Sequence, residues 1–276
     1  MQKAICHYSF HRLWKEQNWT ADRLAEEVAG LGVECIDFHM GLMTGVPDAA
    51  RRIREAVDKH GLKLSGVSCS NDFGQEDPDA FRETIEKVKG WLRLAGEVGA
   101  PVSRVFGGGI GFAHRSDPEL VAGARERILN SVSEVLPTAE ACGVVICIEN
   151  HGGMPATGDE QVDFVKTIDS PFFRATIDVG NYMQAGNEGH VETAKAAPVA
   201  GYVHFKDFRK VPDDDKPWGW GVKSTIVGDG DVDLQACYDA MKDAGYDGVI
   251  ALEYEGPEDE AVGVPRSVET MNRVMT

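Results

Sequence analysis

Short apolar runs alternate along the chain with longer segments in which apolar residues recur at helical spacing. The apolar runs predict strands near residues 4–9, 34–39, 63–69, 102–107, 144–150, 174–180, 201–206 and 248–255. The amphipathic segments predict helices near 20–30, 48–60, 78–98, 117–142, 159–168, 190–197, 232–244 and 265–275. Strands that alternate with helices throughout a chain are typical of β/α units around a parallel sheet. Eight such units predict a closed (β/α)8 TIM barrel.

Residues at the ends of the helical segments support this reading. Asp77-Pro78 places a capping carboxylate before a proline at the first helical position. A glycine follows four of the helical segments, where a left-handed C-cap is favoured: Gly61, Gly99, Gly143 and Gly245. The alternative fold is a doubly wound open sheet, which would normally carry a glycine fingerprint in its first βα turn. We therefore predict one barrel domain over residues 1–276.

Charge and hydropathy limit the partners and the location. A formal charge of −17, from 28 basic and 45 acidic residues, repels phosphate backbones and anionic lipid. The N-terminal apolar run is too short for a signal peptide, and no stretch reaches the ~18 apolar residues of a membrane span. We therefore expect a cytoplasmic protein with no nucleic-acid or membrane partner. Assembly into a homo-oligomer is compatible with the sequence, although no interface can be assigned.

Four consecutive predicted strands each carry a metal-ligand residue near their end. Strand side chains alternate between the barrel interior and the helix layer, and catalytic groups cluster at the C-terminal ends of barrel strands. In each strand the apolar residues take one parity and the ligand residue takes the other, which faces inward. Three carboxylates at one mouth would repel one another unless a cation offset their charge. We predict one divalent ion, Mn²⁺ as first choice with Mg²⁺, Co²⁺ or Zn²⁺ as alternatives, bound by Glu149, Asp178, His204 and Glu253.

Further polar and aromatic residues are candidates for the substrate pocket. Lys206 shares the inward parity of His204 and would either donate to a substrate oxygen or form a salt bridge with Asp207 or Glu253. His151 would either touch substrate or orient Glu149. His7, His39 and His114 lie near predicted strand ends or in the loop beyond, where they could line the pocket. Trp218 lies in the aromatic loop 217–221, which could stack on a sugar or pack on itself.

Four motifs resemble the xylose-isomerase-like sugar isomerase/epimerase superfamily over nearly the whole chain. This superfamily includes ketose 3-epimerases, inosose dehydratase and endonuclease IV. The motifs are Ile148-Glu149-Asn150-His151-Gly152-Gly153, Ile177-Asp178-Val179-Gly180-Asn181, Val203-His204-Phe205-Lys206-Asp207 and Leu252-Glu253-Tyr254. The resemblance implies a TIM barrel with one divalent metal on the four ligand residues above, and proton transfer by Glu149 and Glu253. Asn181 stands where relatives have a histidine for metal or substrate, so we place it at the substrate.

These residues together predict an isomerase or epimerase of a sugar, keto-sugar or polyol-derived ketone. The metal would acidify the C–H next to a carbonyl, and Glu149 and Glu253 would pass the proton through a metal-bound enediolate, assisted by Lys206. Loss of a β-hydroxyl would instead make the chain a lyase (dehydratase) of a keto-polyol, such as an inosose or a dehydroshikimate-like substrate. A non-catalytic metal- or sugar-binding barrel and an AP endonuclease are the remaining hypotheses.

Overall fold

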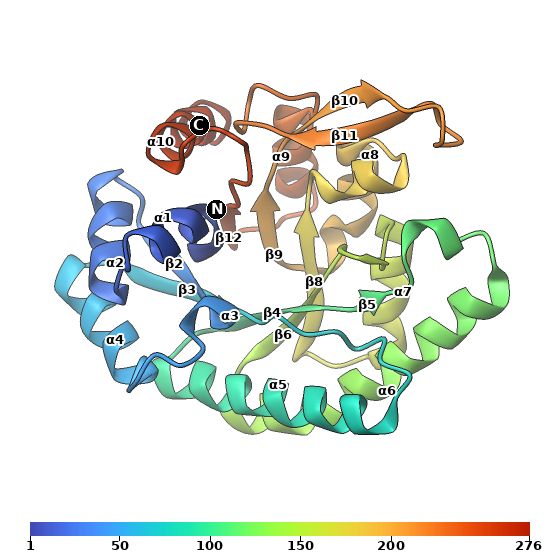
Figure 1. Cartoon of the computed structure of the whole chain (residues 1–276), viewed down its shortest axis with the longest axis horizontal. Helices are drawn as coiled ribbons and strands as arrows, with labels where there is room; N and C mark the ends of the chain where they lie inside the picture. The colour runs from blue at the N-terminus through green and yellow to red at the C-terminus, as the bar shows by residue number, and fades with distance from the viewer.

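Eight parallel strands close into a barrel in the computed structural model, which describes residues 1–276 apart from the side chain of Ala113 (Figure 1). β1 pairs in parallel with both β12 and β2, so that Ile5 lies opposite Leu252 on one side and Ile36 on the other. This closure confirms the predicted (β/α)8 barrel and excludes the open doubly wound sheet. The order around the barrel is β1 (Gln2–Cys6), β12 (Val249–Leu252), β9 (Ala200–Phe205), β8 (Phe173–Asp178), β6 (Val145–Glu149), β4 (Val102–Phe106), β3 (Lys63–Ser68) and β2 (Cys35–His39).

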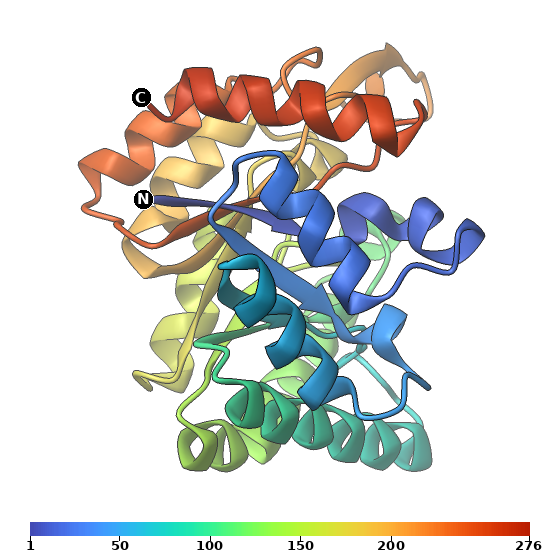
Figure 2. The same cartoon turned by 90° about the vertical axis from the view of Figure 1, so that its left-hand side faces the viewer.

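Amphipathic helices cover the outside of the barrel. Figures 1 and 2 show α10 on one side and the long helices α5 and α6 packed together on the opposite side. The predicted C-terminal glycines all have positive φ, as at Gly99 (74°) after α5 and Gly143 (68°) after α6. Within the described residues, no helix is both long enough and apolar enough to cross a membrane. The outer helices are α2 (Ala21–Gly30), α4 (Ala49–His60), α5 (Pro78–Val98), α6 (Pro118–Cys142), α7 (Gly158–Ile168), α8 (Gly189–Ala196), α9 (Leu234–Asp243) and α10 (Glu260–Val274).

Three predicted boundaries are wrong by three residues or more, among them the end of the strand predicted at 248–255, which stops at Leu252. The first strand ends at Cys6, and the 3-10 helix η1 (His7–Phe10) replaces the rest of the run predicted at 4–9. The chain turns there because the Ser9 hydroxyl donates to Leu252 O and accepts from Tyr254 N, each at 2.9 Å. The last helix begins at Glu260 rather than near 265, because Asp259 supplies the N-cap and Pro265 lies inside the helix.

Segments beyond the strand ends add structure that the alternating pattern does not indicate. After β9 the chain forms an antiparallel hairpin of β10 (Phe208–Pro212) and β11 (Trp220–Ser224), visible at the upper edge of Figure 1. Because these segments follow barrel strands, they lie around the end of the barrel where active sites form. The others are α1 (His11–Glu16), α3 (Met40–Met43), β5 (Gly108–Gly109), η2 (Phe112–His114), β7 (Gly153–Met154) and η3 (Asn181–Ala185). A further 3-10 helix, η4 (Ala197–Val199), lies instead between α8 and β9.

The packing of α10 on the barrel gives a stability prediction. Gly263 faces the buried ring of Tyr254, and a Cβ at this position would overlap ring atoms. Gly263→Ala should therefore lower the free energy of unfolding by about 1–3 kcal/mol. Gly90→Ala in α5 is the matched control, because a Cβ there meets nothing within 4 Å, and it should raise that free energy by about 0.5–1 kcal/mol. Urea unfolding of both variants checks this; equal stability of the two would contradict the packing.

Candidate metal centre

Four buried side chains meet where β6, β8, β9 and β12 end. Glu149 and Asp178 are the last residues of β6 and β8, His204 lies one residue before the end of β9, and Glu253 directly follows β12. One ligand atom of each lies within 4.8 Å of those of the others. None of the four residues is more than 4% exposed. The structure thus brings together all four residues predicted to bind a metal.

Asn150 fixes the position of Asp178 across two neighbouring strands. Its side-chain NH₂ donates to Asp178 O, and its side-chain oxygen accepts from Asp178 N, both at 2.8 Å. Asp178 Oδ1 in turn accepts the backbone N–H groups of Gly180 and Asn181 at 2.9 Å. These bonds hold one carboxylate oxygen in the loop and leave Oδ2 for the cluster.

Unpartnered polar atoms in the cluster indicate which kind of group it can hold. Within the described part of the chain, Glu149 Oε2, Asp178 Oδ2 and His204 Nε2 are buried and have no hydrogen-bond partner. The two carboxylate oxygens nevertheless lie near buried cations, Glu149 Oε2 3.2 Å from Arg104 Nε and Asp178 Oδ2 3.3 Å from Lys206 Nζ. Burying the His204 nitrogen unpaired is costly, and it therefore points to an ion or a water. Three carboxylates and one imidazole are ligands that Mn²⁺, Mg²⁺, Co²⁺ and Zn²⁺ accept. The donor set fits a divalent cation.

Two buried cationic side chains lie against the same carboxylates. Lys206 Nζ is 2.6 Å from Glu253 Oε2 and 3.3 Å from Asp178 Oδ2. Arg104 Nε is 3.2 Å from Glu149 Oε2, and its Nη2 is 3.9 Å from Glu253 Oε1. The Lys206–Glu253 salt bridge is one of the two alternatives that the sequence left open, and it does not prevent Lys206 from meeting a substrate.

Burial and neighbouring charge act in opposite directions on these groups. Burial raises the pKa of Asp178 to about 7, because Lys206 does not compensate for the lost hydration and for the nearby glutamates. Burial would also raise the pKa of Glu149, but Arg104 and His204 outweigh this effect and hold the pKa of that carboxyl below its usual range. Burial by itself lowers the pKa of His204, yet Glu253 and Glu149 raise the pKa of the imidazole well above its usual value. The two glutamates therefore favour positive charge on the neighbouring imidazole.

A cavity of about 180 Å³ opens beside the cluster. Glu253 and Lys206 line it directly, and His151 forms part of the wall, stacked on Phe106 with ring centroids 4.2 Å apart. Drug-sized ligands occupy pockets of roughly 300–1,000 Å³, so this cavity suits a smaller molecule. The remaining lining residues are Tyr8, His39, Ser70, Arg104 and Glu255.

Two other predicted substrate-binding residues lie beside the cluster but do not line this cavity. His7 is buried against Trp14, with ring centroids 4.2 Å apart. Asn181 donates its backbone N–H to Asp178, and its side-chain oxygen accepts from Gln184 Nε2 at 2.8 Å. Asn181 thus helps to hold Asp178, and contact of either residue with a substrate remains a prediction.

The last two predicted residues lie in segments outside the barrel strands. His114 ends η2 and is exposed. Trp218 lies in the β10–β11 hairpin against Gly186, edge-on to Trp220 with ring centroids 6.3 Å apart. Among the alternatives for this loop, the structure therefore shows the tryptophans packing on their own surroundings. Contact of either residue with a substrate is not tested.

Arg104 is absent from the predicted site residues, although it is among the largest fully buried side chains. Its guanidinium donates to Cys69 O at 2.9 Å and lies over the ring of Phe106, 4.1 Å from the centroid. An arginine in the middle of the apolar run 102–106 is the signal that could have identified it, because a buried charge needs a partner. Tyr8, Ser70, Phe106 and Glu255 carried no comparable signal.

Comparison with known proteins identifies the family of this barrel. A family model described as the xylose isomerase-like TIM barrel matches residues 25–274. The chain belongs to this family. Among its curated relatives is D-psicose 3-epimerase of Ruminiclostridium cellulolyticum, to which this chain is 25% identical over 266 residues. The match covers 90% of this chain and 83% of the relative. The chain is 20% identical over 261 residues to L-ribulose-5-phosphate 3-epimerase UlaE of Escherichia coli, covering 92% and 87%.

A solved structure supports the fold of this family member independently. The xylose isomerase-like TIM barrel protein from Mycobacterium smegmatis in complex with magnesium matches with a TM-score of 0.74 at 18% identity. The match covers 100% of this chain and 96% of that one. At this identity the likeness concerns the barrel and not its activity.

The paired hydrogen bonds of Asn150 give a prediction for the centre. Asn150→Ala leaves the buried N–H and C=O of Asp178 without their partners, which should lower the free energy of unfolding by about 2–3 kcal/mol. Because Asp178 is then less well held, affinity for Mn²⁺ should fall by about 10–100-fold. Asn272→Ala is the control, since it removes only an exposed hydrogen bond from Lys3. Calorimetric titration and thermal unfolding test this. Unchanged Mn²⁺ affinity in Asn150→Ala would argue against a role of the two Asn150 hydrogen bonds in holding Asp178.

Proposed function

We propose that this chain is a divalent-metal-dependent isomerase or epimerase of a small sugar, keto-sugar or polyol-derived ketone. Glu253 carries the proposal, because its carboxylate belongs to the four-ligand cluster and also lines the 180 Å³ cavity beside Lys206. A carboxylate at the boundary between a metal centre and a cavity is suited to removing a substrate proton. The names of the two curated relatives, both sugar 3-epimerases, support the epimerase alternative.

Glu149, Asp178, His204 and Glu253 would hold the divalent ion, with Mn²⁺ as first choice and Mg²⁺, Co²⁺ or Zn²⁺ as alternatives. When bound, the ion would polarise a carbonyl and its neighbouring hydroxyl and so acidify the C–H between them. The magnesium complex of the Mycobacterium smegmatis family member supports a divalent ion in this kind of barrel.

The proton transfer falls to the chain's own side chains. Lys206, 2.6 Å from Glu253, keeps that carboxylate ionised and ready to accept the proton from the carbon next to the carbonyl. The Lys206 ammonium, also in the cavity wall, donates to the enediolate oxygen as negative charge develops there. Return of the proton to the adjacent carbon by Glu253 gives isomerisation.

Epimerisation requires a second acid on the opposite face of the enediolate. We assign this role to Glu149, because its Oε1 and Glu253 Oε2 both lie near His204 Nδ1, at 3.1 Å and 3.5 Å, so that the two carboxylates belong to one centre. Glu149 lies deeper than Glu253 and does not line the cavity. It therefore meets only a substrate that reaches down to the cluster itself.

The cavity wall suits a sugar-sized ligand. His151 and His39 offer ring nitrogens, and Tyr8 offers an aromatic face on which the C–H side of a sugar can pack. The Phe106 ring is already covered by His151 and Arg104 and completes the wall. We propose His151 as a direct substrate contact. Asn181, His7, His114 and Trp218 are weaker proposals because they lie outside this cavity.

Lys206 also favours a second candidate function, dehydration of a keto-polyol. After Glu253 has taken the proton, the Lys206 ammonium can protonate a departing β-hydroxyl on the same side of the cavity. A lyase of this kind produces an enone that absorbs ultraviolet light, whereas an isomerase or epimerase does not. Absorbance during turnover of a ketone therefore separates the two.

Metal dependence is the first test of this function. Chelation should abolish activity, and Asp178→Ala or His204→Ala should lower Mn²⁺ occupancy, because each removes one protein ligand. Mn²⁺ should raise the Tm of the unmodified chain, since only the folded state presents all four ligands. Asp239→Ala, an exposed carboxylate in α9, is the control and should keep full occupancy. Full activity of metal-free protein would rule out this mechanism.

The role of Glu253 is the second test. Glu253→Gln keeps the size and one coordinating oxygen but removes the base, so metal should stay bound while turnover falls by ~100-fold or more. In D₂O the unmodified enzyme should place deuterium on the carbon next to the carbonyl, and the variant should suppress this exchange. Glu258→Gln, an exposed acid outside the cavity, serves as the control. Wild-type turnover in Glu253→Gln with metal retained would refute the assignment.

A further inference from the structure

We propose that Cys6, His204 and Glu253 form a second, sulfur-containing ligand set that takes a thiophilic divalent cation such as Zn²⁺. The proposal rests on the four-ligand centre of the proposed function, because the two sets share His204 and Glu253. Cys6 is not used in the proposed catalytic steps. Its thiol is nevertheless buried at the same end of the barrel.

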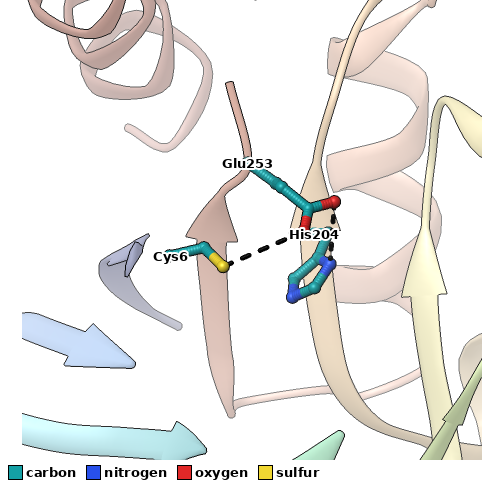
Figure 3. A group of neighbouring side chains, drawn as sticks. All are labelled: Cys6, His204 and Glu253. Carbon is teal, nitrogen blue, oxygen red and sulfur yellow. Dashed lines mark hydrogen bonds and ion pairs between the residues drawn. The ribbon is translucent and has the colours of Figure 1, made fainter. Parts of the chain in front are cut away.

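Three neighbouring strands bring this set together. β12 lies between β1 and β9 in the barrel, so the end of β1 places Cys6 beside Glu253, with His204 on the next strand. One ligand atom of each residue lies within 4.8 Å of those of the other two. Figure 3 shows the thiol directed at the Glu253 carboxylate and the His204 ring. Among the described cysteines, Cys6 alone belongs to such a group.

Each shared residue has a donor atom available on the Cys6 side. Glu253 Oε1 accepts the Cys6 thiol at 3.9 Å and lies at the same distance from Arg104 Nη2, while its Oε2 lies against Lys206 and His204 Nδ1. His204 Nδ1 is engaged by the two glutamates, but its Nε2 is buried without a hydrogen-bond partner in the described part of the chain. Figure 3 shows the ring edge with this second nitrogen turned to the side of Cys6.

The donor chemistry selects a different ion from the four-ligand centre. Thiolate sulfur with imidazole nitrogen and one carboxylate oxygen is a typical zinc environment, whereas Mg²⁺ and Mn²⁺ prefer oxygen. On binding, the S–H bond of Cys6 gives way to a sulfur–metal bond and the proton leaves to solvent. Asp37, buried and opposite Cys6 in the β1–β2 register, adds negative charge that favours a cation here.

Because the two sets share His204 and Glu253, we expect the two ions to compete for these residues. A thiophilic ion bound through Cys6 withdraws His204 from the four-ligand centre and occupies the carboxylate of Glu253, which is also the proposed base. Zn²⁺ should therefore displace Mn²⁺ and inhibit the enzyme.

Cadmium binding to the metal-free full-length chain tests the ligand set directly. Cd²⁺ should produce an ultraviolet sulfur-to-cadmium charge-transfer band in the unmodified chain and in Cys237→Ser, whose buried thiol lies in α9. The band should be absent in Cys6→Ser and Cys6→Ala. Binding of Cd²⁺ by the unmodified chain without this band would overturn the proposal, whether or not the Cys6 variants fold.

Displacement of one ion by the other tests this competition. Zn²⁺ titrated into the Mn²⁺-loaded chain should release Mn²⁺, observed by its electron paramagnetic resonance signal. Cys6→Ser should require ~10-fold or more Zn²⁺ for the same release while its affinity for Mn²⁺ stays unchanged. Equal release from both chains would refute this competition. Failure of the proposed function looks different: the unmodified chain would bind no Mn²⁺ and still show the cadmium band.

Discussion

The burial of three carboxylates at one end of a closed barrel is the constraint on which the rest of the site depends. Glu149, Asp178 and Glu253 cannot stay ionised there without positive charge nearby, because burial penalises each of them and each repels the others. The chain supplies two fixed cations, Arg104 and Lys206, from strand β4 and from the end of β9. Beside these cations the pKa values of Glu149 and Glu253 lie below their usual range, whereas that of Asp178 stays raised, at about 7.

The barrel satisfies this constraint through the adjacency of its strands. β6, β8, β9 and β12 are consecutive around the sheet, so residues that are far apart in the chain arrive within ligand distance. The register places Asp178 opposite His204, and the Asn150 side chain joins the ends of β6 and β8 by two hydrogen bonds. Geometry at the centre is therefore set by backbone pairing, with the loops determining which ligand can approach.

The parts of the fold and site that follow from the strand pattern could be predicted from the sequence. Alternation along single strands was enough to place Glu149, Asp178, His204 and Glu253 inside the barrel. Arg104 was missed because its partners lie on other strands, and a single charged residue in an apolar run gives no indication of them. The η1 turn was missed because contacts distant in sequence determine it, as with Ser9 and the end of β12. The β10–β11 hairpin is a local antiparallel pairing that the alternation of strands and helices does not indicate.

The pairing of the first and last barrel strands determines when during synthesis the site can form. β12 is held by β1 on one side and by β9 on the other, and it delivers Glu253 only once both pairings exist. During synthesis, a chain that has emerged only as far as β9 carries the other three ligands but lacks the fourth and an enclosed barrel. The four-residue cluster is therefore complete only late in assembly, after the barrel has closed, and a partly made polypeptide does not present it.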